Sequence, residues 1–395
     1  MKTALYQTLD NKLPSMVKVR RHLHMHPELS FHETKTAAFI AQWYETLGIP
    51  YRANVGGNGI VATIKGELPG KTVALRADFD ALPIQDEKKA PYSSVTDGVC
   101  HACGHDGHTS TLLHVAESFW LHKAQLQGTI VLIHQHAEEL HPGGAQSMID
   151  DGCLEGVDMI FGTHLWSLTP TGTVQYVSGP MMAAADKLDI VVQGKGGHGA
   201  QPHHAKDAIV AASQLVLQLQ TVVSRNIDPL EAAVLSIGSF EARNPFNVIA
   251  DRVTMSGTVR TFQPTVRNAV EEATKRICDG VARSANVHID LTYLRSYPAV
   301  VNHDVATTYV KKAAEKVPEV THTEQMVPVM PAEDFAYYLE HVEGAFFFTG
   351  AQPDNVDEPF PHHHPRFDFN EKALLIAAKT LTGAALDYLS THAVK

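Results

Sequence analysis

The sequence contains a dense cluster of residue types that bind metals, the segment His101-Ala-Cys103-Gly-His105-Asp106-Gly-His108. Imidazole and thiolate groups are the usual ligands of borderline ions such as zinc. The two glycines let the backbone turn so that several of these side chains can face one point. An isolated cysteine here would be interpreted as a buried residue before a helix. The number of ligand types so close together instead predicts a metal centre.

The same segment contains a Cys-x-x-Cys pair, Cys100 and Cys103, which raises the alternative of redox chemistry. A redox pair of this spacing is expected in a thioredoxin-like strand–helix–strand unit. Here the pair is predicted to lie in a loop that leads to His105. The sequence therefore favours metal binding over a redox function.

Two adjacent carboxylates, Glu138 and Glu139, follow the apolar run at residues 129–133. Open α/β sheets bind ligands beyond the ends of their strands. Adjacent side chains of an extended chain point in different directions. One glutamate could therefore bind a metal while the other accepts a proton from water as a general base. The alternative is a solvated acidic turn, which the buried strand before the pair makes less favourable.

Two further histidine sites lie elsewhere in the chain. His164 follows a short apolar strand predicted at residues 159–162, and a run of three histidines, residues 362–364, precedes Pro365. Taken alone, the first would be interpreted as a core histidine and the second as a surface loop. They become candidate metal ligands only in combination with the cluster at His101–His108.

The elements that must position these residues fall into two patterns. The first half of the chain alternates amphipathic helices with apolar strands, which predicts an α/β sheet covered by helices on both faces. Its predicted helices are 14–25, 33–47 and 111–122, and its predicted strands are 60–65, 72–76 and 128–135. Near the C-terminus the same pattern returns, with helices at 304–316 and 373–389 and a strand at 346–349.

The middle of the chain has a different order of elements, β-α-β-β-α-β, which is the ferredoxin-like arrangement. The predicted strands are 188–193, 233–241, 253–262 and 287–294, and the predicted helices are 208–223 and 266–282. The sequence therefore predicts a ferredoxin-like module at residues 184–298. This module would be inserted into a larger domain made of residues 1–183 and 299–395.

Composition excludes several classes of protein. The 395 residues are 44% hydrophobic and carry a formal net charge of −11, and no run of basic residues suggests nucleic-acid binding. No segment approaches the roughly 20 apolar residues of a membrane span. The N-terminus lacks the apolar core of a signal peptide, and four cysteines are too few for a disulfide framework. We expect a cytoplasmic protein with no nucleic-acid or membrane partner.

The order of these motifs resembles the amidohydrolase branch of the aminoacylase–carboxypeptidase metallopeptidase superfamily. This branch includes N-acyl-amino-acid amidohydrolases, hippurate hydrolases and indole-acetyl-amino-acid hydrolases. The resemblance covers almost the whole chain. Its motifs are Arg20-Arg-His-Leu-His-Met-His-Pro-Glu28, Arg76-Ala-Asp-Phe-Asp-Ala-Leu-Pro83, the His101–His108 cluster, Glu138-Glu139, Gly162-Thr-His164, Gly194-Lys-Gly-Gly-His198, Asn247-Val-Ile249, Gly257-Thr-Val-Arg260, Glu333-Asp-Phe335 and His363-His-Pro365.

The resemblance implies an α/β catalytic domain with a mixed sheet, residues 1–183 plus 299–395, and an inserted ferredoxin-like dimerisation domain, residues 184–298. It implies a homodimer or a higher oligomer, and two divalent metal ions, with zinc or manganese expected and cobalt or nickel also acceptable. The implied metal ligands are Cys103, which bridges the ions, and His105, Glu139, His164 and His363. The implied catalytic residues are Glu138 as general base, Asp80 as an orienting carboxylate and His198. The implied substrate contacts are His198, Asn247 and Arg260.

The chain departs from the usual pattern of this family at two places. Relatives usually have proline at the position of His136, and Gly-Gly or Gly-Ala where this chain has Pro331-Ala332. Both sites are expected near the substrate. An acyl preference therefore cannot be transferred from a single relative.

The function implied is hydrolysis of the amide bond of small N-acyl amino acids. Two alternatives stay open. One is a dipeptidase or carboxypeptidase on the same scaffold, and the other is a metal-dependent binding protein that has lost catalysis. An intact Glu138 beside the ligand Glu139 argues against the second alternative, because a binding protein needs no base.

Overall fold

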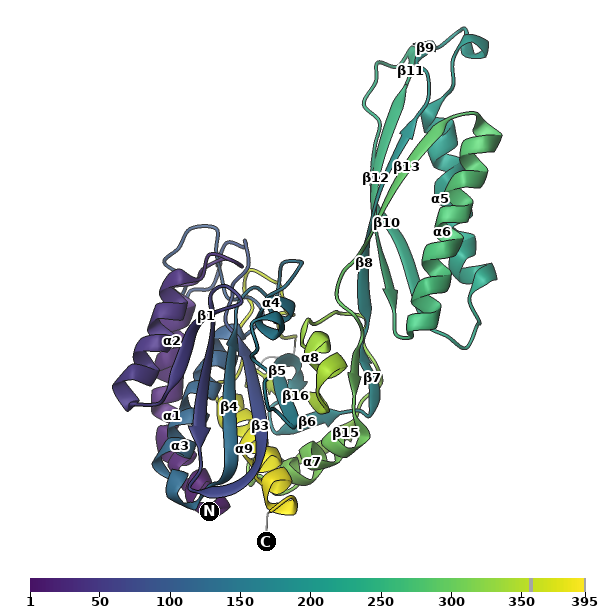
Figure 1. Ribbon diagram of the computed structural model, residues 1–395. Coiled ribbons are helices and arrows are strands. Elements are labelled where there is room, and N and C mark those ends of the chain that lie inside the picture. Colours follow the sequence, from purple (N-terminus) through teal and green to yellow (C-terminus); the bar gives the residue numbers. More distant parts are fainter. Residues whose placement is uncertain (355–357, 394–395) are drawn as a thin grey trace. The chain divides into compact units, whose positions relative to one another are not determined.

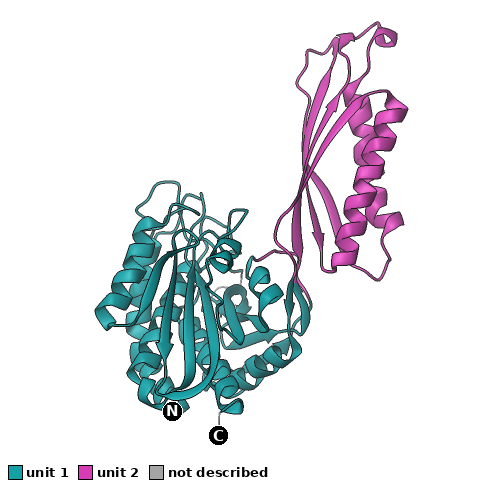
Figure 2. Ribbon diagram, viewed as in Figure 1, with its two compact units in different colours: residues 1–181, 300–327, 334–395 teal, residues 182–299, 328–333 magenta. Residues whose placement is uncertain are grey.

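The computed structural model describes residues 1–354 and 358–393. The chain divides into two compact units, which are coloured separately in Figure 2. Unit 1 contains residues 1–181, 300–327 and 334–395, and unit 2 contains residues 182–299 and 328–333. No sequence signal pointed to the short return segment 328–333 as part of the second unit.

Unit 1 is built on an eight-stranded mixed sheet with the strand order β1-β2-β4-β3-β5-β16-β6-β15 (Figure 1). Its strands are β1 (Tyr51–Val55), β2 (Gly59–Lys65), β3 (Leu68–Asp78), β4 (Gln127–Gln135), β5 (Met159–Pro170), β6 (Thr173–Tyr176), β15 (His322–Gln325) and β16 (Gly344–Gln352). A separate two-stranded ribbon pairs β7 (Gly179–Met182) with β14 (Val300–Asn302).

The four central strands, β4, β3, β5 and β16, run parallel to one another. They are buried along most of their lengths, as expected for parallel strands that are covered on both faces. Because parallel strands end at one edge of the sheet, the loops that follow β3, β4 and β16 leave from the same edge. This edge positions the candidate site.

Helices cover both faces of this sheet, which confirms that prediction. On one face α9 (Ala373–Thr391) lies against the central strands, and Phe161 and Leu165 of β5 belong to the core it covers. On the other face the intervening Gly162 faces Phe335 of α8 (Phe335–His341). The remaining helices of the unit are α1 (Lys2–Met25), α2 (Thr34–Leu47), α3 (His105–Leu121), α4 (Ala145–Asp150) and α7 (Asp304–Ala314).

Several boundaries differ from the predictions. Helix α1 begins at Lys2 rather than at residue 14, and Pro14 lies inside it. The buried side chains Leu5 and Leu9 hold the first turns against the core, so tertiary packing outweighs the proline stop signal. Helix α3 begins at His105, six residues before the predicted start at 111. The metal-ligand cluster therefore spans a helix N-terminus.

Unit 2 has the predicted β-α-β-β-α-β order, which confirms the ferredoxin-like fold. Its sheet has the strand order β10-β12-β8-β13, and every neighbouring pair is antiparallel. The elements are β8 (Ala184–Gln193), α5 (Ala208–Asn226), β10 (Ala233–Glu241), β12 (Arg252–Thr261), α6 (Pro264–Ala285) and β13 (His288–Arg295). Both helices pack on one face of the sheet around a separate hydrophobic core (Figure 1).

A small two-stranded ribbon extends from one end of this sheet, where β9 (Gly197–His198) pairs with β11 (Val248–Ile249). None of the helices in the described parts of the chain is long and apolar enough to cross a membrane.

Candidate metal centre

Arg76 and Asp78 are alternate residues at the end of β3 and therefore share one face of the strand, and Asp80 follows two residues beyond it. All three are buried. Arg76 donates to Asp78 Oδ2 at 2.6 Å and to Asp334 Oδ1 at 2.9 Å. This buried ion pair fixes the strand end to the loop before α8.

His108, one of the four ligand candidates in the first cluster, is not available to a metal in this arrangement. Its Nδ1 lies 2.6 Å from Asp78 Oδ1, and its Nε2 accepts a hydrogen bond of 2.9 Å from the Leu165 N–H. Burial lowers the pKa of His108 and favours the neutral ring that this pattern requires. His108 therefore connects β3 to β5 and positions the strand that carries His164.

His101 also lies outside the centre. Its ring is buried beside that of His24, with ring centroids 6.2 Å apart. Burial lowers its pKa to about 3, so it is neutral. Of the four cluster candidates, only Cys103 and His105 lie with the other predicted ligands.

Asp80 orients His105. Its Oδ1 and its backbone carbonyl lie 3.1 and 3.0 Å from His105 Nδ1. Its Oδ2 accepts hydrogen bonds from Ser30 Oγ at 2.6 Å and from the Glu139 N–H at 3.0 Å. Burial raises the pKa of Asp80, but these hydrogen bonds outweigh burial and leave the pKa below its ordinary value. A carboxylate on one ring nitrogen is the usual support of a metal-binding histidine, because it directs the other nitrogen outward.

His105 Nε2 and Glu139 Oε1 face each other at 3.8 Å, and His105 Nε2 is buried without a hydrogen-bond partner among the described residues. Buried polar atoms without partners are rare and call for an explanation such as an ion. Cys103 completes this group, since its sulfur and these two atoms lie within 4.8 Å of one another. The donors are one sulfur, one nitrogen and one oxygen, a set that fits a borderline divalent ion.

The charges around His105 also favour a cation. Burial lowers the pKa of His105, but Asp78, Asp80 and Glu139 outweigh it and raise the pKa to about 10. In the metal-free chain a proton therefore neutralises part of this carboxylate cluster. Burial and the neighbouring Glu139 and Glu138 raise the pKa of the Cys103 thiol. A bound metal would take the place of both protons.

A second group shares the same cysteine. Cys103 Sγ lies 3.4 Å from His164 Nε2 and 3.8 Å from His362 Nδ1. His164 Nδ1 lies 2.8 Å from the Leu165 carbonyl, which leaves Nε2 for the centre. Burial is the main cause that holds the pKa of His164 well below its ordinary value, so the ring is a neutral ligand. Because Cys103 belongs to both groups, it lies where a bridging ligand between two ions would lie.

Two histidines of the C-terminal loop reach the centre. His363 donates its backbone N–H to the Ala102 carbonyl at 2.8 Å, which fixes the loop beside Cys103. The His363 ring is half exposed, and its Nε2 lies 3.2 Å from Glu139 Oε1. Its neighbour His362 is the one grouped with Cys103 and His164. Sequence reasoning selected His363 from the run 362–364 by its position before Pro365, and the choice among the three histidines rested on that alignment.

We expect His363→Ala to lose about one of the two metal ions per chain and His362→Ala to keep both. His362 is held by other contacts, since its ring lies 4.6 Å from that of Trp166 and its Nε2 accepts from the Ser167 N–H at 3.4 Å. Among the described residues, the ring nitrogens of His363 have no such second contact, and Nε2 is directed at Glu139. Metal content per chain, measured by plasma mass spectrometry, checks this. The reverse result would transfer the ligand role to His362.

The Glu138–Glu139 pair does not diverge as predicted from an extended chain. Ala137 has a φ of 52°, and its N–H donates to Glu33 Oε1 at 2.8 Å, so the chain turns before the pair. As a result Glu138 Oε2 lies 4.0 Å from His105 Nε2, close to the 3.8 Å of Glu139 Oε1. Both carboxylates therefore reach the same side of His105.

The Cys-x-x-Cys pair is divided between two clusters. Both cysteines are free, and Cys100 is buried beside His24, Asp86 and Lys88 rather than at the metal centre. Lys88 Nζ lies 3.2 Å from Asp86 Oδ1 and 3.8 Å from Cys100 Sγ. The Lys88 ammonium group therefore supplies the positive charge in this second cluster, where a metal ion would otherwise be expected.

The remaining predicted site residues lie in unit 2, at two separate places. Pairing of β9 with β11 puts His198 opposite Val248, and Gly199 N–H donates to the Asn247 carbonyl at 2.8 Å, so His198 and Asn247 are neighbours. Arg260 lies near the other end of β12, opposite Ala185. The strand between Arg252 and Arg260 spans roughly 26 Å at 3.3 Å per residue.

Asp78 and Ser30 are the residues of the centre that sequence reasoning missed, whereas His362 was named only as part of the run 362–364, from which alignment to Pro365 selected His363. Asp78 could have been predicted, because it lies two residues before Asp80 in the same Arg76–Pro83 motif, and alternate residues of an extended chain share one face. Ser30 carries no such periodic signal.

Comparison with known proteins identifies the family of the chain. The model of peptidase family M20/M25/M40 matches residues 74–387. YhaA of Bacillus subtilis (strain 168) is 55% identical over 96% of both chains. An N-acyl-L-amino acid amidohydrolase of Geobacillus stearothermophilus is 43% identical over 77% of this chain and 82% of its own length. The structure of Bacillus subtilis YXEP, described as a dinuclear metal-binding peptidase of the M20 family, superposes with a TM-score of 0.83 at 35% identity, covering 97% of this chain and 99% of that one. The chain therefore belongs to peptidase family M20/M25/M40.

Proposed function

We propose that this enzyme hydrolyses the amide bond of small N-acyl amino acids and releases a carboxylic acid and a free amino acid. The observation that carries the proposal is the pair of buried donor groups that share Cys103, with Glu138 beside them. The names of the relatives support this substrate class, since one of them is an N-acyl-L-amino acid amidohydrolase.

The donor atoms at Cys103 suit two divalent ions. We propose that Cys103, His105, Glu139, His164 and His363 would hold the two ions, with Cys103 common to both donor groups and His363 beside Glu139. Zinc or manganese is expected, and cobalt or nickel should also be accepted by this mixture of sulfur, nitrogen and oxygen ligands. When bound, the ions supply Lewis-acid activation of water and of the amide carbonyl.

The chain supplies the proton transfers. Glu138, next to the ligand Glu139 and 4.0 Å from His105 Nε2, is the general base that accepts a proton from the attacking water. The same carboxyl group then delivers this proton to the amide nitrogen as the bond to the carbonyl carbon breaks. Asp80 holds His105 in one orientation throughout. His198 is proposed to stabilise the negative charge on the carbonyl oxygen during attack.

The expected charge of the loaded centre fits an anionic substrate. Two divalent ions would exceed the charge of their two anionic ligands, the Cys103 thiolate and the Glu139 carboxylate, and Arg76 pairs with the neighbouring Asp78. Arg260 adds a positive charge among the proposed substrate contacts. An N-acyl amino acid carries a free α-carboxylate, which this charge would attract.

Turnover is expected to depend entirely on added metal. Exhaustive chelation should abolish the release of amino acid from N-acetyl-methionine or hippurate, and zinc, manganese, cobalt or nickel should restore it to different degrees. Activity that survives in protein shown by metal analysis to be empty would refute the metal-dependent mechanism.

The same substrate panel separates the two alternatives. Turnover of dipeptides alone would indicate a dipeptidase. No turnover of any amide by protein with two ions per chain would indicate a binding protein.

A further inference from the structure

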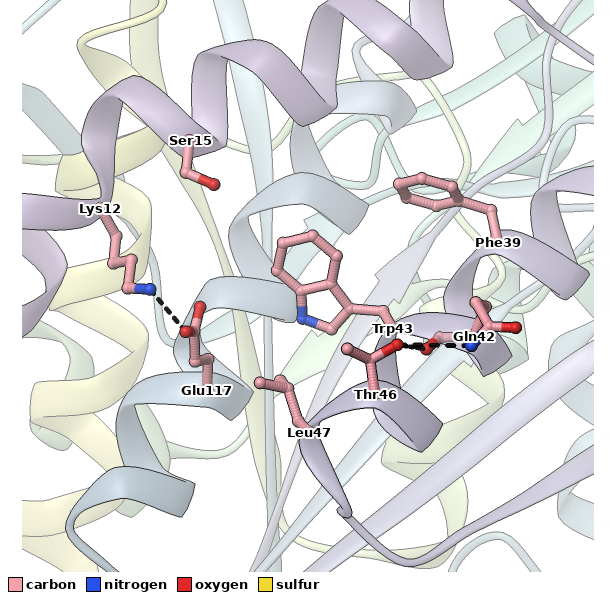
Figure 3. Close-up of a pocket in the computed structure, with 8 residues that line it drawn as sticks. All are labelled: Lys12, Ser15, Phe39, Gln42, Trp43, Thr46, Leu47 and Glu117. Atoms are coloured by element: carbon pink, nitrogen blue, oxygen red, sulfur yellow. Dashed lines mark hydrogen bonds and ion pairs between the residues drawn. The ribbon is translucent and has the colours of Figure 1, made fainter.

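A small pocket lies between three helices of unit 1, on α1, α2 and α3 (Figure 3). Its volume is about 260 Å³. Glu117 at the pocket and His105 at the metal centre belong to the same helix, α3, and are separated by roughly 18 Å along its axis at 1.5 Å per residue. The residues that line the pocket are Lys12, Ser15, Phe39, Gln42, Trp43, Thr46, Leu47 and Glu117.

One wall of the pocket is apolar and the opposite side carries an ion pair. Phe39, Trp43 and Leu47 project from α2 into the space (Figure 3). Across from them Lys12 Nζ lies 2.5 Å from Glu117 Oε1, and the Glu117 side chain is only 12% exposed. The pocket therefore offers a cation, an anion and an apolar surface within one small space.

The polar groups of the pocket are not all satisfied. Trp43 Nε1 is buried and has no hydrogen-bond partner among the described residues. Other polar neighbours are already engaged, because Gln42 donates to Thr46 at 3.3 Å and Ser15 Oγ lies 2.9 Å from His114 Nε2. The Trp43 Nε1 atom is itself covered by protein atoms, so a ligand in the pocket would contact the indole ring and not this donor.

We propose that this pocket binds a free α-amino acid with an apolar side chain. The ligand's ammonium group would pair with Glu117, its carboxylate with Lys12, and its side chain would lie against Phe39, Trp43 and Leu47. The volume is below the roughly 300–1,000 Å³ of pockets for drug-sized ligands, which suits a molecule of this size.

The charge pair selects a zwitterion over a simple ion. A ligand with only a carboxylate would compete with Glu117 for Lys12 and leave a nearly buried carboxylate unpaired, which is costly. A ligand with only an amine would leave Lys12 without its partner. A zwitterion replaces the one ion pair with two and leaves no charge unpaired.

A free amino acid is also the class of product that the proposed reaction releases. Since the pocket and His105 share α3, a product bound here contacts the helix that carries a metal ligand. This link to catalysis rests on the proposed function, whereas binding itself does not.

Calorimetric titration of L-leucine into the metal-loaded protein tests the proposal. Two analogues isolate the charges, 3-methylbutylamine, which lacks the carboxylate, and 4-methylpentanoate, which lacks the ammonium group. We expect leucine to bind at least about 10-fold more tightly than either analogue, because each loses a charged hydrogen bond. Equal affinity for all three, or no binding of leucine, would overturn the proposal.

Variants locate the binding site. Lys12→Met and Glu117→Gln should each weaken leucine binding by about 10–100-fold, and Lys12→Arg should retain most of it. Lys71→Met is the matched control, because it removes another ion pair of unit 1, with Asp158 at 2.6 Å, away from the pocket. Unchanged leucine affinity in both test variants would place the amino acid elsewhere, for example at the metal centre. Because neither measurement depends on turnover, failure here and failure of the proposed amidohydrolase activity are separate results.

Discussion

Glu138→Gln is expected to keep both metal ions and to lower kcat by about 10²–10⁴-fold, the range that a general base contributes. Glutamine is nearly the same size as glutamate, so the turn after Ala137 should be preserved. The amide cannot accept a proton from water or deliver one to the leaving nitrogen. Initial rates with N-acetyl-methionine, together with metal content per chain, measure both effects.

Glu139→Gln is the matched control for this prediction. Glu139 Oε1 lies 3.8 Å from His105 Nε2 and 3.2 Å from His363 Nε2, so the carboxylate is placed among the proposed ligands. We expect this variant to lose metal first and to recover part of its activity at high metal concentration. If instead Glu138→Gln empties the centre and Glu139→Gln retains the ions, the two roles are exchanged.

The existence of the metal centre could be predicted from sequence, but the ligands within the cluster could not be chosen by spacing. His105 and His108 have the same residue type and lie on the same helix. His105 faces the centre because Asp80 engages only its Nδ1, whereas His108 is held at both nitrogens by Asp78 and the Leu165 N–H. The Leu165 contact comes from a strand distant in sequence, and local spacing carries no information about it.

The secondary structure also divides into elements that the local sequence predicts and elements that form only through pairing with distant strands. The elements of unit 2 alternate clearly, and their order alone predicts the ferredoxin-like arrangement. The strands β6 and β15 were missed because they are four residues long and largely polar, Thr173-Val-Gln-Tyr176 and His322-Thr-Glu-Gln325. They form strands because each pairs with the other and β6 also pairs with β16, which is a long-range cause.

The proposed substrate contacts of unit 2 lie too far apart to reach one small ligand from a single chain. His198 and Asn247 lie at one end of its sheet, and Arg260 lies near the other, roughly 26 Å away along β12. A small N-acyl amino acid cannot span that distance. If all three residues contact one substrate, we infer that a second copy of the chain contributes to each site. The strands β10 and β13 are the free edges of this sheet, and edge pairing across a two-fold axis would give a closed dimer.

The prediction that follows is complementation between inactive variants. His198→Ala should fold, bind both ions and dimerise, because His198 is an exposed residue of a short ribbon, yet it should lose catalysis. After subunit exchange with inactive Glu138→Gln, each mixed dimer should contain one site with an intact Glu138 and an intact His198 from its partner. A 1:1 mixture should then recover about one quarter of the wild-type sites, since half of the dimers are mixed and half of their sites are complete.

The matched control carries both changes in one chain. When the double variant is mixed with wild-type protein, a mixed dimer has no complete site if His198 acts across the interface, because the wild-type Glu138 then faces the partner's alanine. If His198 acts within its own chain, the wild-type half of every mixed dimer stays active and the first mixture stays inactive. Native mass spectrometry shows that mixed dimers have formed. The two mixtures therefore give opposite results under the two arrangements, and zero activity in the first with mixed dimers present would place His198 in the site of its own chain.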